Sequence, residues 1–384
     1  MPYLQSLCGL LFVFAAFAPL GARAQGAPAF VPPPPQIAAN AWLLIDVSSG
    51  QLITGYKIDE RIEPASLTKL MTAYIAFDAL KQKKIKPEQV APVSERARRA
   101  VGSRMFIDQK TPVTVDELLR GMIVQSGNDA AVAIAELIGG SEEAFAGLMN
   151  REAKRLGLAS TNFTNATGMP DAALRSTPRD LATLTAALIR DYAEFYPLYA
   201  QKEYRYNNIT QPNRNRLLWR DDTVDGVKTG HTESAGYCLV ASAKRGERRL
   251  ISVVMGAASE SARAAESQKL LNYGFQGYDT VRLYEKNQPA TTLRVWKGAS
   301  NTLRAGFQSD LFVTAPKGMA DKLKAKIESQ QPLIAPVRAG QKIGTLKVEL
   351  DGKPWREMPL VALEDAPVAG FFGRTWDTVR LYFN

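Results

Sequence analysis

The sequence predicts an α/β or α+β domain of about 250 residues, followed by a small all-β domain. Helical patterns fill the middle of residues 41–277, and strand patterns lie at both ends of that range. Beyond Tyr278 the pattern changes to short alternating runs separated by Gly and Pro. The composition, 46% hydrophobic and 22% charged, is that of a globular protein with a sizeable core.

Strand patterns lie at both ends of the first domain, and two of their connections indicate antiparallel pairing. Ala41–Asp46 and Gln51–Gly55 flank a Ser-Ser-Gly turn and predict a β-hairpin. The turn-rich segment Lys244–Glu247 joins two later strands and indicates that they pair antiparallel. The later strand patterns are Val224–Thr229, Gly236–Ala243 and Leu250–Gly256.

Helical patterns occupy six segments of this domain. Thr114 and Glu117 form the sequence signature of a capping box at the start of one helix, and Gly139-Gly140 is expected to end another. The expected helices are Ser66–Lys81, Val115–Val124, Asp129–Ile138, Ser141–Leu156, Pro178–Tyr192 and Ala262–Tyr273.

The N-terminus has the features of an export signal. Leu10–Leu20 is mostly apolar but too short to span a bilayer. Small residues at Ala22 and Ala24 fit a secretory cleavage site, although no Lys or Arg precedes the apolar run. We therefore expect a signal peptide at 1–24 and a Pro-rich lead at 25–40 that acts as an extended tether.

Residues 278–367 predict a β-rich domain. Short alternating runs such as LRVW and GTLKVEL are separated by turn residues, and Asp351-Gly352 is a strong hairpin signal. The segment has no candidate nucleophile in a recognisable setting. We therefore expect it to act as a spacer or an interaction module.

Residues 368–384 predict an amphipathic helix. Phe372, Trp376, Val379 and Phe383 recur at helical spacing and form an apolar stripe, while arginines occupy other positions. Aromatic side chains opposite arginines are typical of a helix that lies on a membrane surface. The alternative is a C-terminal helix that packs on its own domain.

The charge and the cysteine content narrow the classes of function. The formal net charge is +10, and it becomes +9 when Arg23 leaves with the signal peptide. Such an excess favours anionic surfaces, which for an exported protein are lipid and cell-wall polymer, and no nucleic-acid-binding module is recognisable. The single His and the lack of His/Cys clusters argue against a metal, and we expect no cofactor. Cys238 is the only cysteine after the signal and is expected to pack as a small hydrophobe.

Three short motifs carry the candidate chemistry. The S-x-x-K motif Ser66–Lys69 puts a hydroxyl and an amine on one helical face, because residues at i and i+3 are neighbours on a helix. The S-x-N motif Ser126–Asn128 falls between two predicted helices, where a loop can present side chains to a cleft. The K-T-G motif Lys228–Gly230 ends a predicted strand, and its glycine allows a ligand backbone to approach closely.

In this order the motifs resemble those of the penicillin-binding protein and serine β-lactamase superfamily. The two serines are 60 residues apart and the lysine of K-T-G follows 102 residues later, a spacing similar to that of low-molecular-mass D-alanyl-D-alanine carboxypeptidases. The likeness extends through Asn213–Trp219, Val224–Gly226, His231 and Glu266–Leu271. It implies a DD-peptidase-like fold over residues 41–277, an antiparallel sheet with a helical cluster.

The resemblance implies acyl transfer through a serine. Ser66 would attack the carbonyl between the two terminal D-alanines of a peptidoglycan stem peptide and form an acyl-enzyme. Lys69 would act as the base if neutral, a state favoured by burial and by a neighbouring cation such as Lys228. Ser126 would relay a proton to the departing D-alanine. Asn128 would hold the substrate amide and orient the lysine.

Other residues are implied to bind the substrate. Lys228 and Thr229 would bind the terminal carboxylate, beside Gly230. The backbone N–H groups of the nucleophile and of His231 would form the oxyanion hole. Arg263 matches a position at which these carboxypeptidases carry an arginine for carboxylate recognition, although a charge at a helix start explains it equally well.

Three alternatives remain open. A β-lactamase needs fast hydrolysis of its acyl-enzyme, and residues 161–168 offer no glutamate for that step. A DD-endopeptidase would cut peptide crosslinks with the same apparatus, and a non-catalytic wall-binding protein would not need the nucleophile. The favoured hypothesis is a periplasmic carboxypeptidase that β-lactams acylate. Its C-terminal helix would attach it to the anionic outer face of the cytoplasmic membrane.

Overall fold

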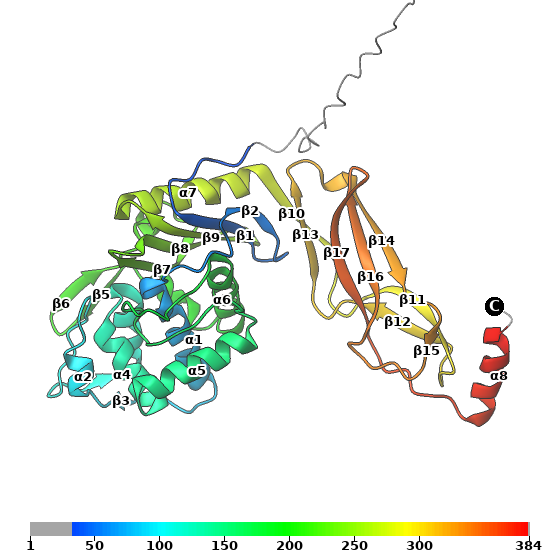
Figure 1. The fold of residues 1–384 in the computed structure, drawn as a ribbon, viewed down its shortest axis with the longest axis horizontal. Helices are drawn as coiled ribbons and strands as arrows, with labels where there is room; N and C mark the ends of the chain where they lie inside the picture. The colour runs from blue at the N-terminus through cyan, green and yellow to red at the C-terminus, as the bar shows by residue number, and fades with distance from the viewer. Residues whose placement is uncertain (1–32, 383–384) are drawn as a thin grey trace, which may run out of the picture.

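A computed structural model describes residues 33–382 (Figure 1). The predicted signal peptide and the first half of the predicted lead lie outside the described residues, as does Phe383 of the predicted apolar stripe.

A five-stranded antiparallel sheet forms the centre of the first domain. Its strand order is β2-β1-β9-β8-β7, so the N-terminal hairpin pairs with the strands that follow the helices. The strands are β1 (Ala41–Asp46), β2 (Leu52–Tyr56), β7 (Val224–Thr232), β8 (Gly236–Arg245) and β9 (Arg248–Ala257). This arrangement confirms the predicted sheet and its antiparallel pairing.

Helices cover both faces of the sheet, with α7 (Glu260–Gly277) and the short turn η4 (Arg216–Trp219) on one side and the other helices gathered on the opposite side (Figure 1). The helices are η1 (Ala65–Thr68), α1 (Lys69–Lys81), α2 (Glu95–Arg98), α3 (Val115–Arg120), η2 (Gly121–Gln125), α4 (Asn128–Gly139), α5 (Glu142–Arg155), α6 (Pro178–Asp191), η3 (Tyr196–Ala200), η4 (Arg216–Trp219) and α7 (Glu260–Gly277). Two short ladders accompany them, β3 (Val90–Ala91) with β4 (Val113–Thr114) and β5 (Glu203–Tyr206) with β6 (Ile209–Pro212).

The helix predictions were correct in position but not always in form. The helix expected from Ser66 begins as the 3₁₀ turn η1, and the helix expected over 115–124 changes into a π-helix, η2. The capping box at Thr114 and Glu117 is present. Both irregular turns lie next to a candidate motif, where irregular helices often serve a site.

Two apolar layers bury the sheet. Strand β9 shows the alternation, because Leu250 and Val254 pack with the side of α7 that carries Leu270. Ile251 and Val253 point the other way and join the larger cluster under α1, α4 and α6. The two layers hold β7, the edge strand that carries the K-T-G motif, against the helical cluster.

The second domain is all β, as predicted. Its six-stranded sheet has the order β14-β16-β17-β12-β11-β15, and β10 pairs with β13 beside it. The strands are β10 (Tyr278–Tyr284), β11 (Pro289–Trp296), β12 (Thr302–Gly306), β13 (Leu311–Pro316), β14 (Leu323–Ser329), β15 (Leu333–Ile334), β16 (Lys342–Leu350) and β17 (Lys353–Ala362), with the turn η5 (Ala320–Lys322). Asp351-Gly352 joins β16 to β17, which confirms the predicted hairpin.

Polar contacts join the two domains. Asp46 is fully buried and accepts hydrogen bonds from Arg248 (2.8 Å) and from Thr280 at the start of the second domain (2.6 Å). The far end of the second domain carries the helix α8 (Phe371–Tyr382) (Figure 1). Across residues 33–382 we find no helix whose length and apolar character would let it span a bilayer.

Candidate active site

The S-x-x-K motif lies on the 3₁₀ helix η1 and the start of α1. Three residues per turn align positions i and i+3, so the Ser66 and Lys69 side chains lie one above the other. The Lys69 Nζ atom is 3.0 Å from the Ser66 Oγ atom. Gly168 lies against this turn with φ +81°, and a Cβ there would lie 1.8 Å from the Ala65 carbonyl oxygen. The turn is therefore fixed by a contact that only glycine permits.

Lys69 is buried among oxygen atoms. Its side chain is only 1% exposed, and its ammonium donates to Asn128 Oδ1 and to the Thr167 carbonyl, both at 2.6 Å. Asn128 thus orients the lysine toward Ser66. Its Nδ2 atom donates to the Val101 carbonyl at 2.6 Å.

The pKa of Lys69 falls from its ordinary value to about 7. Burial is the largest cause and the positive charge of Arg214 is the next, while Asp129 and Glu142 act in the opposite direction. Lys228 was the predicted neighbouring cation, but Arg214 is the cation that acts on Lys69. Burial and the charge of Lys69 hold the pKa of Lys228 itself well below its usual range.

Ser126 stands at the junction between η2 and α4. Its backbone is left-handed, with φ +68°, which is uncommon for a residue with a side chain and occurs at functional sites as well as in turns. The Ser126 Oγ atom accepts a hydrogen bond of 2.8 Å from Lys228 Nζ. Ser126 is therefore connected to the K-T-G strand across 102 residues of sequence.

The K-T-G strand runs close to the nucleophile's turn. A Cβ on Gly230 would lie 3.1 Å from the Pro64 carbonyl oxygen and 3.3 Å from the Ser66 backbone nitrogen. The Lys228 side chain does not line the cleft, because its ammonium points to the Ser126 hydroxyl and the Thr229 carbonyl. Thr229 and Gly230 line it directly.

Arg263 of α7 reaches the same strand. Its guanidinium is buried and donates to the Gly230 carbonyl at 3.1 Å, and it forms an ion pair of 3.4 Å with Glu260. His231 is exposed and lies with its ring 4.0 Å from that of Tyr237. These contacts join α7 to the outer end of β7.

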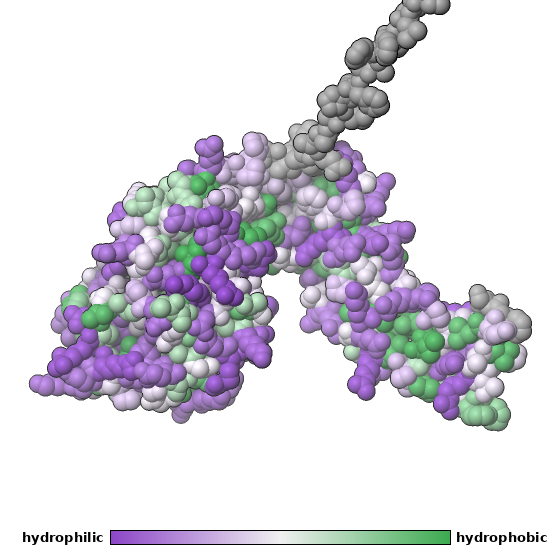
Figure 2. Space-filling model, in the orientation of Figure 1, coloured by the Kyte–Doolittle hydropathy of each residue, from purple (hydrophilic) through white to green (hydrophobic). Residues whose placement is uncertain are grey.

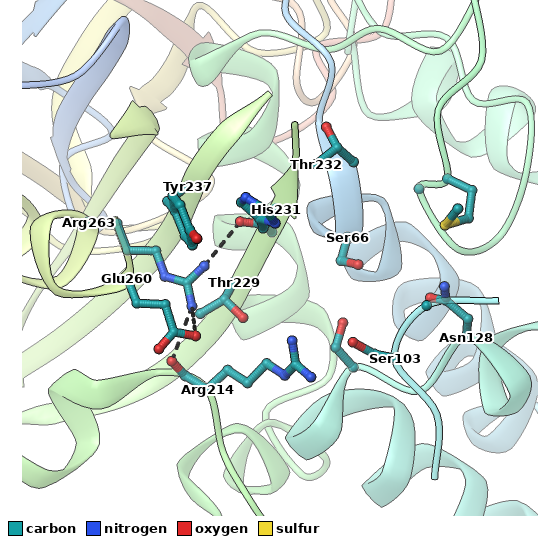
Figure 3. Close-up of a pocket in the computed structure, with 15 residues that line it drawn as sticks. Ser66, Ser103, Asn128, Arg214, Thr229, His231, Thr232, Tyr237, Glu260 and Arg263 are labelled. Carbon is teal, nitrogen blue, oxygen red and sulfur yellow. Dashed lines mark hydrogen bonds and ion pairs between the residues drawn. The ribbon is translucent and has the colours of Figure 1, made fainter. Parts of the chain in front are cut away.

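These residues surround a cleft of about 450 Å³ (Figure 3). Ser66 lies near its centre, with Ser103 and Asn128 on one side and Thr229 and Arg263 on the other (Figure 3). The Arg214 side chain extends across the cleft from the side of α7 toward Ser103 (Figure 3). The structure thus brings the three motifs together around one hydroxyl group.

Sequence reasoning missed several residues of the site. The buried Asp129 accepts hydrogen bonds from the backbone N–H groups of 105–107 at 2.7 to 3.2 Å and so holds the segment that carries Ser103. Glu142 accepts from the Ala166 N–H at 3.0 Å and fixes the loop whose carbonyl contacts Lys69. Asp129 directly follows the S-x-N motif, and this adjacency was the one available signal.

The arrangement supports acyl transfer without a metal ligand set. Within residues 33–382, no group of three or more His, Cys, Asp or Glu side chains is positioned to hold a metal ion. A hydroxyl 3.0 Å from a buried amine whose pKa is lowered to about 7 is the arrangement that activation of a serine nucleophile requires.

Comparison with known sequences gives matches over both domains. Residues 28–259 match peptidase family S11, D-alanyl-D-alanine carboxypeptidase, and residues 278–367 match the C-terminal domain of penicillin-binding protein 5. The chain is 44% identical over 359 residues to the D-alanyl-D-alanine carboxypeptidase DacC of Escherichia coli K12, covering 91% of this chain and 90% of that protein. It is 43% identical over 354 residues to DacA of Haemophilus influenzae, covering 91% and 90%.

Solved structures agree with this. Penicillin-binding protein 5 from Haemophilus influenzae superposes with a TM-score of 0.83 at 43% identity, over 87% of this chain and 99% of that chain. Penicillin-binding protein D2 from Listeria monocytogenes, solved in an ampicillin-bound form, superposes with a TM-score of 0.58 at 30% identity, over 62% and 98%.

Proposed function

The chain belongs to the D-alanyl-D-alanine carboxypeptidase family and is a serine carboxypeptidase of the penicillin-binding protein 5 type, and from this premise we propose a role for each residue of its site. The observation that carries the proposal is the contact of 3.0 Å between Ser66 Oγ and the buried amine of Lys69.

Acylation begins with proton transfer from Ser66 to Lys69. The transfer needs a neutral lysine, and a pKa of about 7 leaves a large neutral fraction at physiological pH. The Ser66 oxygen attacks the carbonyl between the two terminal D-alanines. An ester forms, and the bond to the terminal D-alanine nitrogen breaks.

The oxyanion that develops is held by the backbone N–H groups of Ser66 and His231. The close approach of Gly230 to the Ser66 backbone nitrogen supports this assignment. His231 then acts through its main chain, and its exposed imidazole packs at a tilt against the Tyr237 ring.

Ser126 gives its hydroxyl proton to the departing amine and regains one from the Lys69 ammonium, so the proton taken from Ser66 ends on the leaving D-alanine. The Ser126 oxygen accepts a hydrogen bond from Lys228, which holds it in place for this transfer. The substrate's terminal carboxylate lies against Thr229, with Arg263 behind the strand and Lys228 supplying positive charge from beneath. Asn128 holds the peptide amide with the N–H that its bond to Val101 leaves available.

Hydrolysis of the acyl-enzyme is expected to be slow with β-lactams. The space beside Lys69 is filled by the Thr167 carbonyl, and the carboxylates Asp129 and Glu142 are held by backbone N–H groups. No carboxylate is therefore free to activate water there, within residues 33–382. This favours a β-lactam-inhibited carboxypeptidase over a β-lactamase.

The helix α8 is proposed to attach the enzyme to a membrane surface. Its aromatic side chains are exposed: Phe371 is 70%, Phe372 88%, Trp376 60% and Tyr382 86% exposed. Asp377 is the buried side chain of the helix and accepts a hydrogen bond of 2.6 Å from the Lys297 backbone nitrogen. The helix thus contacts its own domain through a polar residue and leaves its apolar face for another partner.

Apolar residues gather at this end of the molecule among hydrophilic ones (Figure 2). The proposed organisation is a signal peptide (1–24), a lead (25–40), a catalytic domain (41–277), a β-rich spacer (278–367) and an anchor (368–384). The chain would then work in the periplasm on peptidoglycan stem peptides, attached to the outer face of the cytoplasmic membrane.

D-Alanine release from a peptide ending in Lys-D-Ala-D-Ala tests the proposal. We expect release by a protein that ends before α8, and none by its Ser66→Ala variant. Labelled penicillin should acylate the first protein only. A protein that penicillin acylates at Ser66 but that releases no D-alanine would contradict the proposed role of Ser66 and favour an endopeptidase.

A further inference from the structure

A second hollow lies beside the cleft, on the far side of Arg214. Its volume is about 650 Å³, and its lining includes Gln125, Arg214, Arg216, Trp219, Arg220 and Glu260. None of the steps proposed for a terminal D-alanine uses this hollow.

The hollow and the cleft share a wall. Arg214 and Glu260 line both, and Gln125 directly precedes Ser126. On the proposed mechanism, the leaving residue has its nitrogen at Ser126 and its carboxylate at Thr229. Its side chain therefore lies near Arg214, at the entrance to the second hollow.

The charge of the hollow is positive. Arg216 pairs with Glu260 at 2.7 Å, which also contacts Arg263, so the carboxylate is already neutralised. The guanidinium groups of Arg214 and Arg220 are exposed and have no hydrogen bond or ion pair with any residue in 33–382.

An aromatic surface completes the hollow. Trp219 is 48% exposed although it follows two fully packed leucines in η4. An indole next to guanidinium groups suits a ligand with aliphatic carbons and a negative end.

We propose that this hollow binds the side chain of the leaving residue, so that the enzyme also removes terminal D-amino acids with acidic side chains. The inference rests on the proposed function. The reaction is the same acyl transfer: the Ser66 ester forms, the C–N bond breaks, and the leaving amine takes a proton through Ser126. The acidic side chain then passes Arg214, lies along Trp219 and pairs with Arg220.

Four peptides that end in Lys-D-Ala-D-Xaa test the inference, with D-alanine, D-glutamate, D-glutamine or D-lysine in the last position. We expect kcat/KM to be about fivefold higher for D-glutamate than for the isosteric D-glutamine, as for a partly exposed ion pair. Among D-glutamate, D-glutamine and D-lysine, D-lysine should have the lowest kcat/KM. The preference for D-glutamate should shrink as salt rises, because exposed charges are screened.

Variants locate the effect. Arg220→Gln should bring the D-glutamate to D-glutamine ratio close to one, and Trp219→Ala should lower kcat/KM for both, with D-alanine release unchanged in each variant. Arg205→Gln, an exposed change on β5 away from the hollow, is the matched control and should keep the wild-type ratio. A wild-type ratio of one, or a ratio that Arg220→Gln leaves unchanged, overturns the inference. Loss of Ser66-dependent D-alanine release would instead overturn the proposed function.

Discussion

Apolar side chains are usually buried and charged ones exposed, but the active site buries charged groups and α8 exposes apolar ones. At the site the charged groups Lys69, Lys228, Asp129 and Arg263 are each at most 3% exposed. On α8, by contrast, Phe372 is 88% exposed. Each arrangement costs free energy in the isolated protein, since charges lose water in one region and apolar surface meets it in the other. The site recovers that cost through internal partners, whereas α8, as the proposed anchor, would recover it from a membrane surface.

The largest effect is expected at Lys69. Lys69→Met removes the base and should lower kcat/KM for D-alanine release by about 10²–10⁴-fold. A neutral side chain of similar length removes the cost of burying an amine but leaves the Asn128 and Thr167 oxygens without their donor, so the melting temperature should fall by a few degrees.

Penicillin acylation and thermal melting should be measured together. A folded variant that keeps most of its acylation rate would show that Lys69 is not the base. Lys69→Arg is the matched control, because it keeps a cation whose pKa is too high for a base.

The second effect is on stability. Asp129→Ala removes the acceptor of three backbone N–H groups at 105–107, two of them in buried hydrogen bonds, and should lower the free energy of unfolding by about 3 kcal/mol. Asp59→Ala is the matched control. Asp59 forms an exposed ion pair with Arg179, and its loss should cost below about 1 kcal/mol. Urea unfolding of both variants measures the difference, and equal losses would show that burial of Asp129 is not what matters.

Asp129 also shows where sequence reasoning reached its limit. Ser66 and Lys69 could be predicted as a pair because one helical turn fixes their spacing, and the capping box at Thr114 depends on four adjacent residues. The bonds from Asp129 to 105–107 and from Glu142 to Ala166 span about two dozen residues, and no local pattern encodes them. The tertiary fold decides whether a given carboxylate accepts hydrogen bonds from a distant loop or remains solvated at the surface.

The same limit explains why the sequence predicted Lys228, and not Arg214, as the cation that lowers the pKa of Lys69. The motif order indicated that all three lysine and serine motifs meet, but not which atoms face one another. Lys228 turns toward Ser126, whereas the exposed Arg214 extends into the cleft from a loop with no regular structure of its own.

The third effect is on membrane binding and tests the other side of the comparison. Trp376→Ser and Phe372→Ser should each weaken binding to anionic vesicles about tenfold or more, because each removes a large aromatic side chain that the membrane would bury. D-Alanine release from a soluble peptide should not change. Tyr56→Ser is the matched control, since Tyr56 is 52% exposed on β2 and far from α8. If all three variants bind vesicles like the wild type, α8 serves a protein partner or its own domain.

The smallest effect concerns Arg214. Lys69 acts as a base only when neutral, so the acylation rate should rise with pH through its pKa of about 7. The charge of Arg214 lowers that pKa, so Arg214→Gln should raise it and move the acid limb to higher pH. A shift of about half a unit would slow acylation about twofold near pH 7 and leave it unchanged well above the limb.

The pH dependence separates this effect from a lost substrate contact, which would lower the rate equally at every pH. Arg220→Gln, which removes a nearby arginine that does not act on Lys69, should leave the limb in place. An unmoved limb in Arg214→Gln would mean that burial alone sets the pKa of Lys69. The energetics of both regions would then be set by contact with water: the loss of water around Lys69 in the cleft, and the exposure of apolar side chains to water on α8.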